Sequence, residues 1–156
     1  MKKGDLTAKL YDELKKRNLF EEEDKDETDN EGGSGNKDFS NMVSVLLHSQ
    51  TQVHVFHLQT KSYSEHKALQ NYYEGIDGLV DGVIESYQGK YNVVKNYETM
   101  DIENYSGVDQ LISYFKDLDK TIEEKRKSVK ESYLQNQIDT IQELIFSTLY
   151  KLRFLK

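Results

Sequence analysis

The spacing of apolar residues in the last quarter of the chain constrains the fold most. From Leu134 onward, large aliphatic side chains recur every three or four residues, the period that places them on one face of an α-helix. The chain contains no proline that would interrupt such a helix. A C-terminal amphipathic helix is therefore predicted on the stripe Leu134, Ile138, Ile141, Ile145, Leu149 and Leu152.

The same period predicts three further helices, over residues 38–59, over residues 63–88 and from residue 108 onward. Neither Gly nor Pro separates the last two of the four helices, so their turn is placed in the polar stretch of residues 124–131. The stripes are Val43, Leu46, Leu47, Gln50, Val53 and His57 in the first helix; Leu69, Tyr73, Ile76, Val80, Val83 and Tyr87 in the second; and Val108, Leu111, Ile112, Phe115, Leu118 and Ile122 in the third.

Local signals mark the helix ends. Ser62 and Glu65 have the spacing of a capping box, in which the Ser hydroxyl and the Glu carboxylate satisfy free N–H groups of the first turn. Gly89 is expected to stop the second helix, and Ser106 is expected to cap the third. The segment between them, residues 89–105, has no clear period and is predicted to be a long connection.

These elements predict an all-α fold, a four-helix bundle over residues 38–156 with one long crossover between its second and third helices. An amphipathic pattern in residues 4–19 predicts a short N-terminal helix within residues 1–20. Residues 21–37 are acidic and then Gly/Ser-rich, which is typical of a flexible tether. Because so short a helix is marginal alone in water, residues 1–20 are expected to bind a protein partner or the bundle itself.

The net charge of −7 is concentrated in the tether. Residues 21–38 hold nine acidic and two basic side chains, whereas residues 1–20 hold six basic and three acidic ones. The remainder is mildly acidic, so DNA, whose phosphates need a basic face, is not an expected partner. The absence of cysteine excludes disulfides and thiolate metal sites. No membrane-length apolar run or signal segment is visible, so a cytoplasmic protein without membrane contact is expected.

Candidate metal ligands are concentrated in one stretch of the chain. His57 is predicted at the end of the first helix and His66 in the first turn of the second. Asp81 and Glu85 lie one turn apart on a face of that second helix. Imidazole and carboxylate ligands suit iron, and also zinc or manganese. The residues therefore predict a metal site formed by His57, His66, Asp81 and Glu85.

Neighbouring side chains bear on this hypothesis. His54 and Asp77 are candidates for a supporting role beside the ligands, whereas His48 falls on the opposite side of its helix from His57. Glu74 extends the acidic stripe of the second helix. An acidic stripe is more often a solvated helix face than a site, and a lone histidine on an apolar face is more often a core residue. Both interpretations stay open from the residues alone.

Three glycines lie inside the predicted second helix. Gly75, Gly78 and Gly82 each cost it about 1 kcal/mol relative to alanine. Gly78 and Gly82 share one face beside the carboxylates, where another helix could approach closely. That helix is either the same helix of a second subunit across a two-fold axis or a neighbour within one subunit, and the spacing does not separate these alternatives.

At these residues the chain resembles the Dps family, the mini-ferritins of the ferritin-like superfamily. That family has a histidine at the end of its first helix, a second histidine opening the next, and an Asp-x-x-x-Glu pair later on that helix. His57, His66, Asp81 and Glu85 match these positions. The resemblance covers residues 40–156 and is nearest to phage-encoded Dps-like proteins with a segment of the form HxxHxQTxSYxEHxAL.

The resemblance implies a ferritin-like bundle with a ferroxidase site between two subunits, the histidines from one chain and the acids from its two-fold mate. Fe(II) bound there is oxidised by hydrogen peroxide or oxygen, and ferric mineral collects in a twelve-subunit shell. It thus implies a homo-oligomer with a two-fold contact through the second helix, located in a host cytoplasm or a virion. Leu58 and Gln70 stand where the family has Trp and, in many members, an acidic residue.

Other functions are also open. A structural or adaptor protein, for example of a phage particle, could keep the bundle without oxidising iron, and the N-terminal helix and tether would then act as a docking peptide. Nucleic-acid binding by the basic residues of residues 1–20 is disfavoured by the adjacent acidic run. The motifs of common hydrolases, P-loop proteins and dinucleotide-binding proteins are absent.

Overall fold

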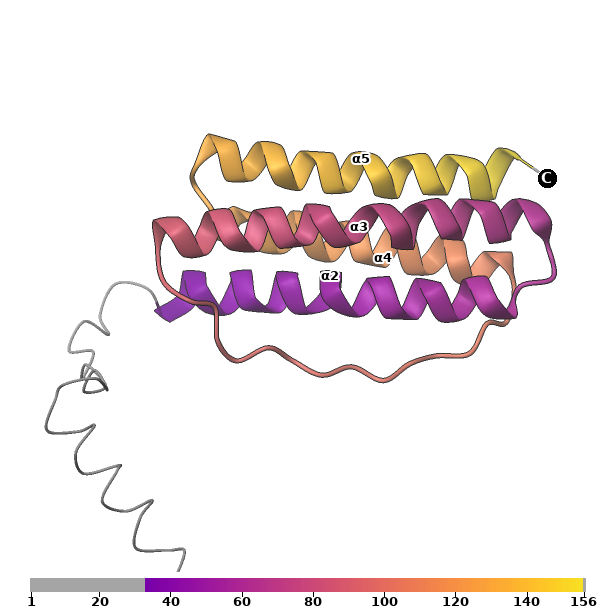
Figure 1. The fold of residues 1–156 in the computed structure, drawn as a ribbon, viewed down its shortest axis with the longest axis horizontal. Helices are drawn as coiled ribbons and strands as arrows, with labels where there is room; N and C mark the ends of the chain where they lie inside the picture. Colours follow the sequence, from indigo (N-terminus) through magenta and orange to yellow (C-terminus); the bar gives the residue numbers. More distant parts are fainter. Residues whose placement is uncertain (1–32, 156) are drawn as a thin grey trace, which may run out of the picture. The chain divides into compact units, whose positions relative to one another are not determined.

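A computed structural model describes residues 33–155, which are helical apart from short turns and one long connection (Figure 1). No strand occurs in this part of the chain, as the all-α prediction requires. The elements are α2 (Gly33–Gln59), α3 (Tyr63–Lys90), α4 (Val108–Lys125), the short 3₁₀ helix η1 (Arg126–Ser128) and α5 (Ser132–Phe154).

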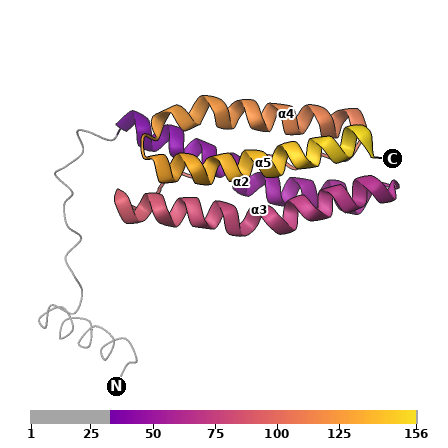
Figure 2. The same cartoon turned by 90° about the horizontal axis from the view of Figure 1, so that it is seen from above.

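The four α-helices form a bundle (Figures 1 and 2). α2 packs against α3 and α4, and α5 packs against the same two helices. A short turn joins α2 to α3, and η1 lies in the turn between α4 and α5, where the polar stretch predicted it. The long connection, residues 91–107, runs beside α2 along the length of the bundle (Figure 1). The predicted long crossover between the second and third helices of the bundle is thus present.

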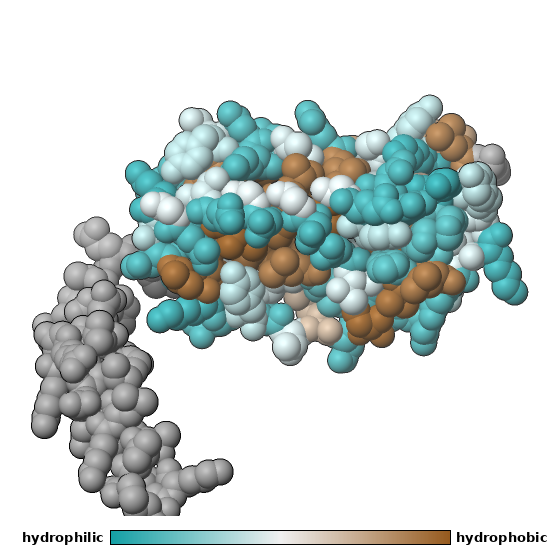
Figure 3. Space-filling view, viewed as in Figure 1, coloured by the Kyte–Doolittle hydropathy of each residue, from teal (hydrophilic) through white to brown (hydrophobic). Residues whose placement is uncertain are grey.

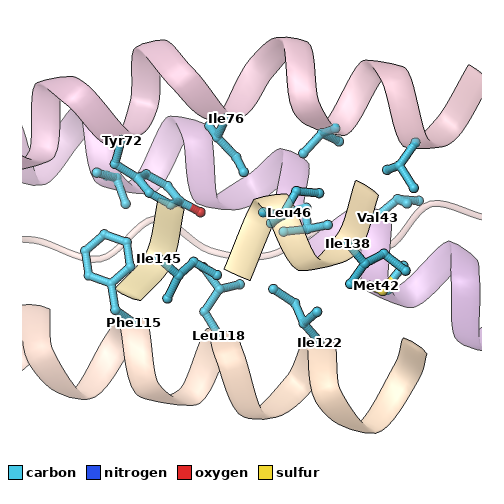
Figure 4. Packing of buried hydrophobic residues seen from close by; sticks show 14 of the residues in the cluster. Met42, Val43, Leu46, Tyr72, Ile76, Phe115, Leu118, Ile122, Ile138 and Ile145 are labelled. Carbon is cyan, nitrogen blue, oxygen red and sulfur yellow. The ribbon is translucent and has the colours of Figure 1, made fainter. Parts of the chain in front are cut away.

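The core lies between all four helices (Figure 4). The whole stripe predicted for α5 is buried, which confirms that periodicity. Side chains from facing helices meet in the interior, among them Met42, Val43 and Leu46 of α2, Tyr72 and Ile76 of α3, Phe115, Leu118 and Ile122 of α4, and Ile138 and Ile145 of α5.

The structure contradicts one stripe residue, Leu47, and places another, Tyr73, at the edge of the core. Leu47 of α2 is 40% exposed, because it points away from the contacts that α2 makes with the rest of the bundle. On α3, Tyr73 is only half-buried and Tyr72 is fully buried in its place. The Tyr72 hydroxyl shares a hydrogen bond of 2.8 Å with the hydroxyl of Ser49, so its polar tip is satisfied inside the core.

Polar side chains of α2 hold the crossover against the bundle. Gln52 is only 1% exposed and makes two bonds to Glu103: its amide nitrogen donates to the Glu103 carbonyl at 2.8 Å, and its amide oxygen accepts from the Glu103 N–H at 2.7 Å. Ser40 donates to the carbonyl of Asn96, and Ser44 accepts from the N–H of Glu98. The backbone of an extended segment makes no hydrogen bonds within itself. These side chains therefore supply hydrogen-bond partners for the backbone of the crossover.

The cap of α3 differs in part from the predicted capping box. The Ser62 hydroxyl accepts from the N–H of Glu65 at 3.4 Å, as predicted. The Glu65 carboxylate does not return the bond to the Ser62 N–H. It accepts instead from the hydroxyls of Thr60 and Tyr105, at 2.5 Å and 2.7 Å. Glu65 therefore joins the turn after α2 to the end of the crossover.

The other two predicted helix ends were wrong. α3 continues through Gly89 to Lys90, because Gly89 lies on an exposed face where nothing obliges the helix to stop. The N-cap of α4 is Gly107, with φ of +140°, and it has no side-chain cap. The Gln110 amide oxygen instead accepts from the N–H of Ser106 at 2.7 Å, which satisfies a backbone donor ahead of the helix.

The N-terminal boundary of the bundle lies earlier than predicted. α2 is described from Gly33, so it includes residues of the segment predicted to be tether. The predicted N-terminal helix in residues 1–20 and the rest of the tether lie outside the described residues. Among the helices of residues 33–155, none is long and apolar enough to cross a membrane.

Candidate metal centre

The turn between α2 and α3 brings two of the predicted ligands together. His57 lies in the last turn of α2 and His66 in the first turn of α3. Their rings stack with centroids 3.7 Å apart and planes 27° from parallel. His57 is 7% exposed and His66 is half-buried, so the pair lies at the edge of the core.

The ring nitrogens of the pair have defined roles. Nδ1 of His57 bonds the carbonyl of His66 at 2.9 Å, and Nδ1 of His66 bonds the carbonyl of His57 at 3.2 Å. A carbonyl oxygen can only accept a hydrogen bond, so each Nδ1 carries a proton. In a neutral imidazole the lone pair then resides on Nε2, the atom that would bind a metal. The α2–α3 turn therefore orients two imidazoles so that, in each neutral ring, Nε2 carries the lone pair.

An aromatic residue that the sequence assigned to the core borders this pair. Tyr73 packs edge-on against His57, with centroids 5.1 Å apart, and stacks on His54 at 4.2 Å. His54 is exposed, with its ring 5.9 Å from that of His57, so it contacts the pair mainly through Tyr73. His48 lies elsewhere, as predicted, with its Nε2 3.1 Å from the carbonyl oxygen of Asp101.

A polar network that includes Glu65 and Tyr105 lies beside the pair. Tyr105 donates to Glu65, the residue before His66 in the chain. Burial, and then the hydrogen bond to the Glu65 carboxylate, raise the pKa of the Tyr105 hydroxyl. Tyr105 therefore stays a donor, and the carboxylate that it holds is directed at the crossover rather than at the imidazoles.

The predicted carboxylates are exposed and lie elsewhere on α3. Asp81 and Glu85 come 15 and 19 positions after His66, which places them about 22 Å and about 28 Å further along the helix axis. Asp77, predicted to support the ligands, is also exposed on α3. Within residues 33–155, no three His, Asp or Glu side chains of the single chain are grouped so that they could hold a metal ion. One chain therefore presents the four candidates as two separate pairs.

The glycines of α3 leave part of its surface open. A Cβ at Gly75 would touch the Leu144 side chain at 3.4 Å, so close packing within the subunit accounts for this position. A Cβ at Gly78 would meet nothing within 4 Å, and one at Gly82 would meet only the end of Gln137 at 4.0 Å. Packing within the subunit therefore does not explain Gly78 and scarcely explains Gly82.

The surface around α3 is mixed in character. In Figure 3, which views the bundle with α3 at the front as in Figure 1, apolar patches alternate with hydrophilic side chains. Exposed apolar residues on the neighbouring helix α2 include Leu47 and Leu58. Apolar and hydrophilic side chains thus lie side by side on this face of the bundle (Figure 3).

Comparisons with known proteins gave one match. Residues 57–152, more than half of the chain, match the model of a family described as "Family of unknown function (DUF5856)". The matched segment begins at His57 and includes His66, Asp81 and Glu85. Searches of curated proteins and of solved structures each gave no significant match.

Proposed function

The chain belongs to DUF5856, a family of unknown function, and we propose that it is an iron-binding ferroxidase of the Dps type. In this proposal Fe(II) is the substrate, and it binds between two copies of the chain. His57 and His66 of one copy and Asp81 and Glu85 of the other supply the ligands. The observation that carries the proposal is the histidine pair, in which both Nδ1 atoms are held by backbone carbonyls.

The histidine pair supports metal binding because its orientation is fixed before any metal arrives. Histidine ligands in proteins usually donate their second ring N–H to a carbonyl or carboxylate, which fixes the tautomer and the ring plane. Both His57 and His66 have that arrangement. A solvated histidine has no need of it, so the reciprocal bonds favour a site over an ordinary surface.

A two-fold contact through α3 would complete the ligand set. When two copies of a helix pair antiparallel, residues i and j lie opposite each other if their midpoint is at the axis. The midpoint of residues 66 and 81 falls between 73 and 74, and that of residues 66 and 85 falls between 75 and 76. A two-fold axis near Gly75 would therefore bring His66 of one copy to the acids of the other, twice per dimer.

The open face of α3 is suited to such a contact. Each glycine costs a helix about 1 kcal/mol relative to alanine, so an uncovered glycine in the single chain needs another explanation. Gly78 has free space where a Cβ would be, and it lies within one turn of the inferred axis. A second α3 could approach closely there, which is the role of small residues at helix contacts.

The chemistry of the ligands agrees with the proposal. Asp77, Asp81 and Glu85 repeat every four residues, and like charges at that spacing destabilise a helix unless a cation neutralises them. Two imidazoles with two carboxylates suit Fe(II), and zinc or manganese could compete for the same ligands. Oxidation of two Fe(II) ions would release two electrons, which one hydrogen peroxide accepts together with two protons to give two waters.

The test is the rate of Fe(II) oxidation by the purified protein with hydrogen peroxide and, separately, with oxygen. His57→Ala and Asp81→Ala should each reduce the protein-dependent rate at least about tenfold, because loss of even an outer-shell partner of a metal ligand typically costs that much. His48→Gln and Glu124→Ala are the matched controls, because they change a histidine and an exposed acid outside the proposed site. An unchanged rate in both ligand variants would refute the proposal.

A further inference from the structure

A row of aromatic side chains on α5 has no partner in the bundle. Phe146, Tyr150 and Phe154 are 54%, 55% and 62% exposed and repeat every four residues, so they follow one side of the helix. Figure 2 views the bundle from the α5 side, where α5 runs in front of α2 and its outer surface is uncovered by the rest of the described chain. Exposed apolar rows of this kind mark interaction surfaces.

The aromatic residues belong to a longer pattern. Asp139, Glu143, Phe146, Tyr150 and Arg153 are separated by four, three, four and three residues. This is the alternating spacing of the contact positions in a coiled coil. All five are exposed, on the side of α5 opposite its buried stripe. We call these five residues the outer seam of α5.

The outer seam has an ordered distribution of charge. Its N-terminal end is acidic, its centre is aromatic, and its C-terminal end is basic at Arg153. Asp139 is paired with Arg126 at 2.7 Å, so it is engaged within the bundle. Glu143 and Arg153 form no ion pair among residues 33–155, and the Arg153 guanidinium lies 5.0 Å from the ring centre of Phe154. Within the described part of the chain, one charge of each sign without an ion pair therefore flanks the aromatic centre.

A second copy of the same seam, running antiparallel, complements this distribution. In such a pairing Phe146 faces Tyr150 of the other copy, and Glu143 faces Arg153 of the other copy. Both pairs have their midpoint at residue 148, so a single two-fold axis satisfies them together, each twice. A parallel pairing would instead set Glu143 against Glu143 and Arg153 against Arg153.

We propose that the outer seam of α5 is a contact between two copies of this chain, paired antiparallel about a two-fold axis at residue 148. The occupant is a second copy because the antiparallel seam sets aromatic against aromatic and each charge against its opposite. This contact lies on a different helix from the α3 contact of the proposed function and does not depend on it. A chain with two different two-fold contacts assembles beyond a dimer, as any shell requires.

Charge reversal tests the proposal. Glu143→Arg alone and Arg153→Glu alone place like charges opposite each other at both ends of the seam, so each variant should self-associate at least about tenfold more weakly than the natural chain. An equimolar mixture of the two should associate with each other, because each reversed charge then faces its opposite. Glu124→Arg and Lys130→Glu, exposed and off the seam, are the controls and should change nothing.

The measurement is sedimentation equilibrium for the mass, with native mass spectrometry of an isotope-labelled mixture for the identity of the pairs. All chains carry Gly78→Leu, which blocks the α3 contact. Any loss of self-association then reports on the α5 contact alone. Circular dichroism checks that the variants fold, which is expected because both residues are exposed. Equal association of all variants, or a mixture that forms no mixed pairs, would overturn the proposal.

A cross-linking measurement gives an independent result. The chain contains no cysteine, so Ser147→Cys introduces a single thiol next to the proposed axis. A short bis-maleimide should join two such chains rapidly, and adding Glu143→Arg should slow the joining at least about tenfold. Ser113→Cys, exposed on α4, is the control and should cross-link only slowly. Equal rates for the two thiols would contradict the antiparallel α5 contact.

Discussion

At the scale of single residues, the two stacked histidines combine a local and a tertiary effect. The local effect is the turn that places the last turn of α2 next to the first turn of α3. The tertiary effect is the exchange of bonds between each Nδ1 and the other residue's carbonyl. The sequence could predict that His57 and His66 flank one turn, but the carbonyl bonds depend on the path of the backbone between the helices.

The tautomer of these histidines is a direct consequence of the geometry. Both His57 and His66 should be in the Nδ1–H form in the neutral state, because a backbone carbonyl accepts from each Nδ1. Long-range ¹⁵N–¹H correlation spectra distinguish the two neutral tautomers. Added Zn²⁺, which is redox-inactive, should then shift the Nε2 resonances most. Nε2–H tautomers for both residues would contradict the site geometry.

Two substitutions at Gly78 distinguish its effect on helix stability from its effect on assembly. Gly78→Ala should raise the free energy of unfolding of the isolated chain by about 1 kcal/mol, because alanine favours a helix interior and its Cβ would meet nothing within 4 Å. Gly78→Leu should also fold, yet it should reduce Fe(II) oxidation by blocking the proposed α3 contact. Urea denaturation at low protein concentration measures the first effect. A loss of stability in Gly78→Ala would show that the glycine is needed within the subunit.

At the scale of elements, the periodicity of the chain predicted where the helices lie more accurately than which of their side chains other segments cover. The stripe of α5 is buried throughout because α5 packs against two helices with one regular face. The stripe predicted for α2 does not include Gln52, whereas the crossover covers this side chain almost completely. No local pattern distinguishes a side chain that faces water from one that faces an extended segment, so this contact could not be predicted.

The two bonds of Gln52 give the crossover a measurable contribution to stability. Gln52→Ala should lower the free energy of unfolding by about 1–3 kcal/mol, because the two hydrogen bonds to the N–H and carbonyl of Glu103 would be lost. The Glu103 amide should also exchange its hydrogen faster. Thr51→Ala, the exposed neighbour, is the control and should change stability by less than about 0.5 kcal/mol. Equal stability of Gln52→Ala and the natural chain would contradict the role assigned to this side chain.

At the scale of the whole molecule, one chain carries the four proposed ligands as two pairs at two separate places. The histidine pair lies at the α2–α3 turn, and the exposed acids lie further along α3. The sequence predicted all four residues as one set, although the helical rise alone separates His66 from the two acids along α3. Helical periodicity does not give the relation between the histidines of one chain and the acids of another. The proposed α3 contact supplies that missing relation.

The most direct test of the central proposal mixes two defective chains. One carries His57→Ala with His66→Ala, and the other carries Asp81→Ala with Glu85→Ala. Each alone should lose Fe(II) oxidation. Co-expressed in equal amounts, they should recover about a quarter of the natural rate, because half of the dimers are mixed and each mixed dimer has one complete site. Recovery would establish a site shared between subunits, whereas a mixture as inactive as its components would contradict it.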